Sequence, residues 1–159
     1  MLDSTVQTRQ LAVNAAFLKE IKDDNQHLKV LWDKIIPLAG RSETATNHWI
    51  ELVNLFGELR DQLALHFSLE EAYGYFDEAV DTAPQLSTLA ECLRAEHPKL
   101  FAQVRDLADS AAEVRADRIE RIETCVALFN QFRKNFERHE EAELKLILDS
   151  MDDDIGVGD

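Results

Sequence analysis

Apolar residues recur along the chain at alternating steps of three and four, the period of one buried helix face. Only five glycines and three prolines interrupt this pattern, which favours long helices joined by few loops. Breaks fall at 37–40 and at 74–84, and Asp117 with Glu120 has the spacing of a capping box that opens a last helix. The pattern therefore predicts an all-α fold, an up-down-up-down antiparallel four-helix bundle.

The chain has 159 residues, which is enough for one domain whose core needs no disulfides. We expect the bundle to occupy residues 1–151 and the acidic, glycine-bearing segment 152–159 to form a short disordered tail. Cys92 and Cys125 lack the CxxC spacing of a redox or zinc site. Each is therefore interpreted as a buried, small apolar side chain.

The net charge of −14 argues against nucleic acid and anionic membrane surfaces as partners, because both require clustered Lys and Arg. The start of the chain lacks a basic region followed by an apolar one, and no apolar run approaches the ~20 residues that span a bilayer. We therefore expect a cytoplasmic protein. The sequence does not specify its oligomeric state.

Two His-xxx-Glu pairs interrupt the apolar stripes of the predicted second and fourth helices. His66 and Glu70, like His139 and Glu143, occupy positions whose helical phase points into the core. A spacing of four brings Cβ atoms to roughly 6 Å, so the imidazole and the carboxylate of a pair reach a common point. A histidine also replaces an apolar residue in the third stripe, and another lies beside the apolar face of the first helix. The candidate metal ligands are His27, His66, Glu70, His97, His139 and Glu143.

Burying ionised carboxylates costs several kcal/mol unless each is paired. Histidines satisfied in the core, with glutamates paired to Arg or Lys, explain any single position but not a spacing that occurs twice. Metal ions remove the cost: four imidazoles and two carboxylates suit a pair of iron or manganese ions, with zinc as a further option. We assign His27 and His66 to one ion and His97 and His139 to the other, with Glu70 and Glu143 bridging both.

The two halves of the chain are similar to each other. A shift of 73 residues superimposes the two His-xxx-Glu pairs, and a shift of 70 superimposes His27 on His97. Each half is therefore predicted to form a helical hairpin with one lone histidine and one pair. The two hairpins would face each other across a pseudo-two-fold axis and share the metal ions.

Helical phase also places the residues beside the candidate ligands. Helical phase directs Glu71, Glu140 and Glu141 away from the core, so we expect them to be solvated charges. Tyr73 lies one turn beyond Glu70. Its hydroxyl either hydrogen-bonds a metal ligand or sits at the rim of the core, and the sequence favours neither.

The order of a lone histidine, His66xxxGlu70, a second lone histidine and His139xxxGlu143 resembles the hemerythrin-like HHE cation-binding domain over about residues 10 to 150. The resemblance implies a non-haem di-iron centre that binds, senses or reacts with a small oxidant: dioxygen, peroxide or nitric oxide. The oxygen carriers of the family have further ligands where this chain has Phe101 and Leu144. The pattern is instead similar to bacterial hemerythrin-like and iron-centre repair proteins, whose two glutamates bridge the irons. Whether such a centre is catalytic stays open.

Three other functions compete with this interpretation. Iron-centre repair or iron storage uses the same domain, but repair proteins usually add a cysteine-bearing segment, and no cysteine precedes His27. A histidine phosphotransfer bundle without metal needs an exposed histidine, commonly followed by Lys-Gly, which neither His66 nor His139 has. A ferritin-like oxidase needs an ExxH order, which is missing at the four motif histidines.

Overall fold

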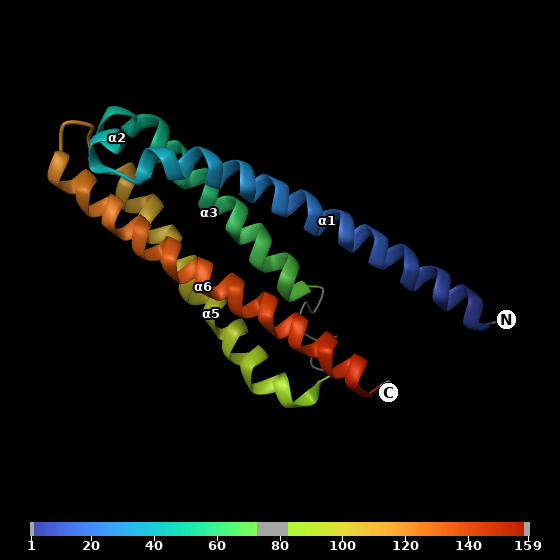
Figure 1. Cartoon of the computed structure of the whole chain (residues 1–159). Coiled ribbons are helices and arrows are strands. Elements are labelled where there is room, and N and C mark those ends of the chain that lie inside the picture. Colours follow the sequence, from blue (N-terminus) through green and yellow to red (C-terminus); the bar gives the residue numbers. More distant parts are fainter. Residues whose placement is uncertain (1, 73–82, 158–159) are drawn as a thin grey trace.

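The computed structural model describes residues 2–72 and 83–157, and within them the side chains of 16, 19–72 and 83–151. The regular elements of these residues are all helical: α1 (Leu2–Ala39), α2 (Ser42–Asn47), α3 (Trp49–Ala72), the 3₁₀ turn η1 (Pro84–Leu86), α5 (Ser87–Ala112) and α6 (Ile119–Val157). The four long helices run alternately up and down, with α1 packed on α3, α3 on α5 and α5 on α6 (Figure 1). The predicted all-α bundle is confirmed.

The expected second helix is divided in two. A short helix, α2, ends at Asn47, and α3 begins at Trp49 after His48 leaves helical geometry. The indole Nε1 of Trp49 donates a hydrogen bond to the carbonyl oxygen of Val114, 2.8 Å away, and this bond ties the start of α3 to the α5–α6 connection. The break therefore lets α2 cross the end of the bundle, where it contacts both α1 and α6 (Figure 1). Tyr73 and Gly74 lie outside the described residues.

The apolar side chains that the structure describes form two separate clusters along the bundle. The large one fills the end near α2 and includes Phe56, Phe129 and Phe132, each at most 1% exposed. The small one, at the other end, consists of Ala90, Leu93 and Leu146 with partly buried neighbours. On α5 and α6, the buried His97, His139 and Glu143 fall between the two clusters, and on α3 the buried Glu70 follows Phe67, the last residue of that helix in the large cluster. The fold thus places a polar layer within an otherwise apolar interior.

The two cysteines differ in their surroundings. Cys125 belongs to the large apolar cluster, as expected, but Cys92 is exposed, so the expectation of burial is wrong for this residue. Position 92 directly precedes the buried Leu93, and one residue of helix rotates a side chain by about 100° away from it. In the described part of the chain, no helix is both long and apolar enough to cross a bilayer.

Candidate metal centre

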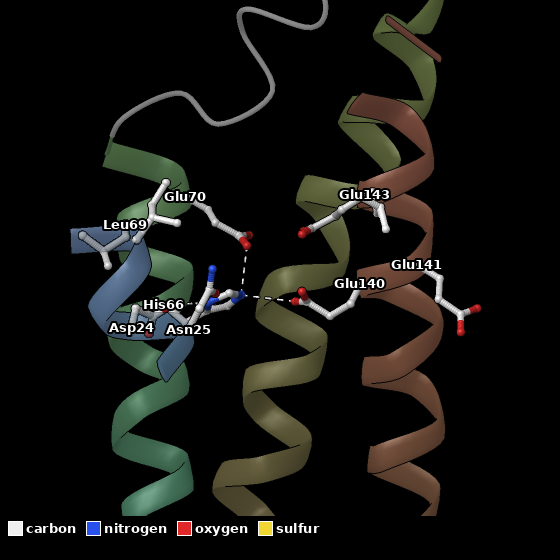
Figure 2. Close-up of a pocket in the computed structure, with 10 residues that line it drawn as sticks. Asp24, Asn25, His66, Leu69, Glu70, Glu140, Glu141 and Glu143 are labelled. Carbon is white, nitrogen blue, oxygen red and sulfur yellow. Dashed lines mark hydrogen bonds and ion pairs between the residues drawn. The ribbon is translucent and has the colours of Figure 1, made fainter. Parts of the chain in front are cut away.

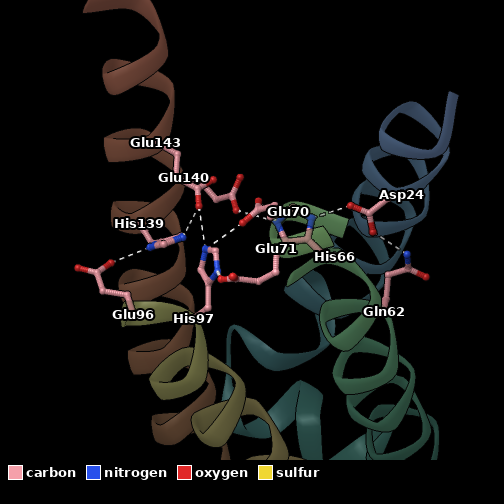
Figure 3. A network of polar contacts seen from close by, with 10 residues as sticks. All are labelled: Asp24, Gln62, His66, Glu70, Glu71, Glu96, His97, His139, Glu140 and Glu143. Atoms are coloured by element: carbon pink, nitrogen blue, oxygen red, sulfur yellow. Dashed lines mark hydrogen bonds and ion pairs between the residues drawn. The ribbon is translucent and has the colours of Figure 1, made fainter. Parts of the chain in front are cut away.

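Three buried histidines turn one ring nitrogen toward a common group of carboxylates (Figure 3). Nε2 of His66 lies 2.9 Å from Glu70 Oε1, and Nε2 of His97 lies 2.9 Å from Glu70 Oε2. Nε2 of His97 is also 3.2 Å from Glu143 Oε1, which is 2.5 Å from Nε2 of His139. Helices α3, α5 and α6 each supply one imidazole. The interior layer is therefore a converging set of nitrogen and oxygen donors.

The other nitrogen of each ring contacts a carboxylate from a neighbouring helix. Nδ1 of His66 lies 2.6 Å from Asp24 Oδ2, and Nδ1 of His139 lies 2.7 Å from Glu96 Oε2. Nδ1 of His97 lies 3.1 Å from Glu71 Oε1. A carboxylate on Nδ1 keeps the proton on that nitrogen and leaves the lone pair of Nε2 free, which is the usual support of a metal-binding histidine.

The inner donors form two groups that share Glu70. One consists of Glu70, His97, His139 and Glu143, all buried, and the other adds His66 and the partly buried Glu140 to Glu70. Within each group, the potential ligand atoms lie within 4.8 Å of one another. Such spacing suits ligands around one ion in each group. The shared carboxylate would then contact both positions.

Two inner atoms are left without hydrogen bonds. Among the described side chains, Glu70 Oε2 and His139 Nε2 are buried and have no hydrogen-bond partner. Each lies within ion-pair distance of an opposing group, but not in hydrogen-bonding geometry. Buried polar atoms normally have a partner, so two unsatisfied atoms at the meeting point of the cluster fit a bound cation.

In the metal-free protein, the protonation states of the histidines and glutamates determine the charge of the polar layer. Burial opposes protonation of His66, but hydrogen bonds to Asp24 and Glu140 outweigh it and raise its pKa to about 12. Carboxylates likewise raise the pKa of His97 to about 10, against the effect of burial. The imidazoles in turn hold the pKa of Glu70 well below its usual range although burial opposes this. Without metal, imidazolium cations thus balance the buried carboxylates, and a metal cation would take over that task.

The structure brings five of the six candidate ligands together but not His27. His27 is exposed and belongs to neither group. The buried face of α1 runs through Leu28, Leu31 and Ile35, and its next residue toward the N-terminus is Asp24, which is 4% exposed. Asp24 also accepts a hydrogen bond from Gln62 Nε2 at 2.8 Å. Extending the stripe by one step of four before Leu28 would have found Asp24 in the sequence.

Two of the glutamates expected in solvent contact the histidines instead. Glu140 Oε1 lies 3.2 Å from Nε2 of His66, and Glu71 contacts Nδ1 of His97 although its side chain is half exposed. The expectation of a solvated charge is wrong for Glu140, which is partly buried, whereas Glu71 is exposed as expected but also contacts His97. It holds for Glu141, which is exposed and points away from His66 in Figure 2. Residues on the flank of a buried stripe face the next helix of a bundle, and phase on one helix does not show this.

A cavity opens onto the His66 side of the cluster. It has a volume of about 320 Å³ and lies between α1, α3 and α6 (Figure 2). Asp24, Asn25 and Glu140 contribute polar groups to its wall, and Ile21 and Leu144 contribute apolar ones. On the other side, the ring of Phe67 stacks on His97 with centroids 4.7 Å apart. A second cavity, of about 770 Å³, lies on that side between α3 and α5, and both His97 and Phe67 line it.

Comparison with known families agrees with this geometry. The family model of the hemerythrin HHE cation binding domain matches residues 16–149. The chain belongs to this family. The predicted resemblance is confirmed, and membership implies metal binding, usually of iron, for which the buried His and Glu side chains offer the ligands. No curated protein and no solved structure matches the chain.

Proposed function

We propose that this hemerythrin HHE protein holds two iron ions in the layer between its apolar clusters and binds, senses or reacts with a small oxidant there. The observation that carries the proposal is the orientation of His66, His97 and His139. Each ring has Nε2 directed inward and Nδ1 against a carboxylate. Three rings oriented alike, on three helices, match a metal centre better than a set of unrelated core histidines.

The two donor groups suggest where each ion would be held. Glu70, His97, His139 and Glu143 would hold one ion, and His66 with Glu70 would hold part of the ligand set of the other. Glu70 is common to both. A bound iron pair supplies electrons, and open positions for ligands, to dioxygen, peroxide or nitric oxide. Iron is favoured over zinc because zinc normally completes a set of four ligands at a single ion, whereas this layer spreads its ligands over two positions that share Glu70.

The chain itself would control access and water. Phe67 packs edge-on to His66 and His139, with centroids 5.4 and 6.4 Å apart, and Phe136 lies edge-on to His66 at 6.2 Å. These rings keep water away from the side of the centre that faces the large apolar cluster. The cavity beside His66 leaves room for a diatomic or triatomic molecule. Asn25, in its wall, offers an amide that can donate a hydrogen bond to such a molecule.

Metal analysis combined with absorption spectra tests this function. Protein expressed in iron-replete medium, or reconstituted with Fe²⁺ without oxygen, is expected to hold about two ions per chain. Exposure to dioxygen, peroxide or nitric oxide should then change charge-transfer absorption that zinc does not produce. Absence of iron after both treatments would overturn the proposal. A zinc or manganese content under the same conditions would reassign the metal.

The competing functions make different demands of the same histidines. Phosphotransfer requires an accessible ring, whereas His66, His97 and His139 are 6%, 4% and 1% exposed. Kinase labelling of one histidine, unaffected by chelator, would favour that function. Iron storage or centre repair shares the metal layer. Release of the iron to an apo-acceptor protein, without a spectral response to oxidants, would favour storage or repair.

Glu96 offers a test of the outer carboxylates. Replacing it with alanine removes the partner of His139 Nδ1, 2.7 Å away, while leaving the inner donors in place. We expect Glu96→Ala to weaken metal binding about 10-fold, the lower end of the effect of an outer partner, because Glu96 is half exposed and water can replace it. Titration with Fe²⁺ under anaerobic conditions measures this. Glu91→Ala, an exposed change on the same helix, should have no effect.

A further inference from the structure

We propose that Glu140 is a metal ligand on the His66 side of the centre and fills the position for which the sequence suggests His27. The inference rests on the proposed two-ion function and completes its weaker half. Without Glu140, the second ion would have only His66 and the shared Glu70 from the groups that converge there. With it, helix α6 contributes to both positions.

The geometry around His66 carries this assignment. Glu140 Oε1 lies 3.2 Å from Nε2 of His66, the nitrogen that also faces Glu70 at 2.9 Å. The three residues offer atoms within 4.8 Å of one another. Figure 2 shows the Glu140 carboxylate directed from α6 toward the imidazole on α3. The carboxylates of Glu70 and Glu140 both face Nε2 of His66 in a partly buried place. A cation between these three groups would stabilise them.

Comparison of the two halves shows that the first half lacks a buried lone histidine. The shift of 73 that superimposes the His-xxx-Glu pairs places Asp24 on His97, and not His27 on His97. Both Asp24 and His97 are buried at equivalent places on their helices. The first hairpin therefore has a carboxylate where the second has an imidazole. The first position lacks the lone histidine that the second one has.

The same shift of 73 residues indicates that Glu140 compensates for this missing histidine. It places Phe67 on Glu140, so the residue after each motif histidine is phenylalanine in one half and glutamate in the other. Phe67 stacks on His97. His97 belongs to the second half, where His139 already provides a second imidazole. Glu140 instead faces His66, whose half lacks one. Both differences concern the ion position beside His66. This position lacks an imidazole because Asp24 replaces it, and it gains the carboxylate of Glu140.

Neither α1 residue competes well for this role. His27 is exposed, outside both donor groups. Asp24 is buried, but its carboxylate lies on Nδ1 of His66, the nitrogen that faces away from Glu70, and on the amide of Gln62. An atom bound to Nδ1 cannot share an ion with Nε2 of the same ring. Asp24 thus orients His66 and leaves the inner position to Glu140.

Four variants of the full chain test the assignment. Glu140→Gln keeps the size of the side chain but replaces an anionic oxygen with an NH₂ group. Glu141→Gln makes the same change one residue away, on the exposed side of α6. His27→Ala and Asp24→Asn change the two candidate residues of α1. Anaerobic titration with Fe²⁺, followed by desalting and metal analysis, counts the ions and their stepwise affinities. Far-UV circular dichroism of each metal-free variant checks that the helices are intact.

We expect Glu140→Gln to lower the content from about two ions per chain to about one, with the second affinity weakened by roughly 10- to 100-fold or more. His27→Ala and Glu141→Gln should retain both ions, and Asp24→Asn should retain both with weaker binding. Two tight ions in Glu140→Gln, or loss of an ion in His27→Ala, would overturn the inference. Loss of an ion in Asp24→Asn alone would give the position to Asp24 instead. A wild-type chain without iron would contradict the proposed function before any variant is compared.

Discussion

Replacement of Glu70 with glutamine is expected to leave the protein with almost no bound metal. Glu70 is the residue common to both donor groups, with Oε1 and Oε2 each 2.9 Å from a different imidazole. An amide of the same shape offers one oxygen and one NH₂ group, and the NH₂ group repels a cation. Both ion positions therefore lose a ligand in a single change. We expect the content to fall from about two ions per chain to near none after desalting.

The neighbouring residues on α3 provide matched controls. Glu71→Gln changes the outer partner of His97. Because the Glu71 side chain is half exposed, metal binding should weaken by about 10-fold at most. Glu58→Gln lies on an exposed part of the same helix and should change nothing. Metal analysis and anaerobic Fe²⁺ titration of the three variants measure the series. If Glu70→Gln kept two tightly bound ions, the sharing of Glu70 between the groups would be wrong.

The helix period predicted which candidate ligands are buried on three of the four helices. His66, His97 and His139 each lie within a continuous apolar stripe, and the stripe alone decides that the side chain is buried. Glu70 and Glu143 follow at a spacing of four, on the same face. Because the burial of a residue inside a stripe depends only on its own helix, the sequence was sufficient here.

The prediction for α1 lacked this support. His27 lies roughly 70° from the centre of the face formed by Leu28, Leu31 and Ile35, and the shift of 70 used to match it differs from the shift of 73 between the pairs. Its residue type favoured a ligand while its phase did not. A single shift of 73 for the whole half indicates Asp24, which the structure shows to be buried.

The outer carboxylates could not be predicted from one helix at a time. Asp24 and Glu96 reach histidines on α3 and α6 from the helices beside them. Which residue of a neighbouring helix meets a given ring depends on how far the two helices are displaced along their axes. Glu140 depends in addition on which flank of α6 faces α3. These quantities come from packing of the whole bundle, and apolar periodicity does not contain them.

The distribution of apolar side chains indicates that the polar layer contributes to the stability of one end of the bundle. Beyond this layer, the apolar cluster formed by the described side chains consists of Ala90, Leu93 and Leu146, with Leu86 and Ala142 packed against it, whereas the large cluster lies on the other side of the layer. Three small to medium side chains stabilise little of two helix ends. We therefore infer that bound metal contributes much of the stability of the segments 87–96 and 144–151.

Removal of metal with a chelator is accordingly expected to lower the melting temperature by roughly 5–15 °C. Metal at 100 to 1,000 times its dissociation constant stabilises the folded state by about 2.7–4.1 kcal/mol. For a domain of this size, each kcal/mol corresponds to about 2–4 °C. Thermal unfolding followed by circular dichroism, with and without chelator, measures the difference. Glu70→Gln is the matched control, since a variant without metal should not respond to the chelator.

Hydrogen exchange tests where this stability is located. Metal-free protein should exchange faster at 87–96 and 144–151, because among the described residues a small apolar cluster and the imidazolium–carboxylate pairs beside it hold these helix ends. Amides at 100–111 and 122–136 belong to the large cluster and should change little. Uniform acceleration along the whole chain would show that the two clusters unfold together. An unchanged pattern, with an unchanged melting temperature, would show that the layer is stable without metal and would contradict its role in holding this end of the bundle.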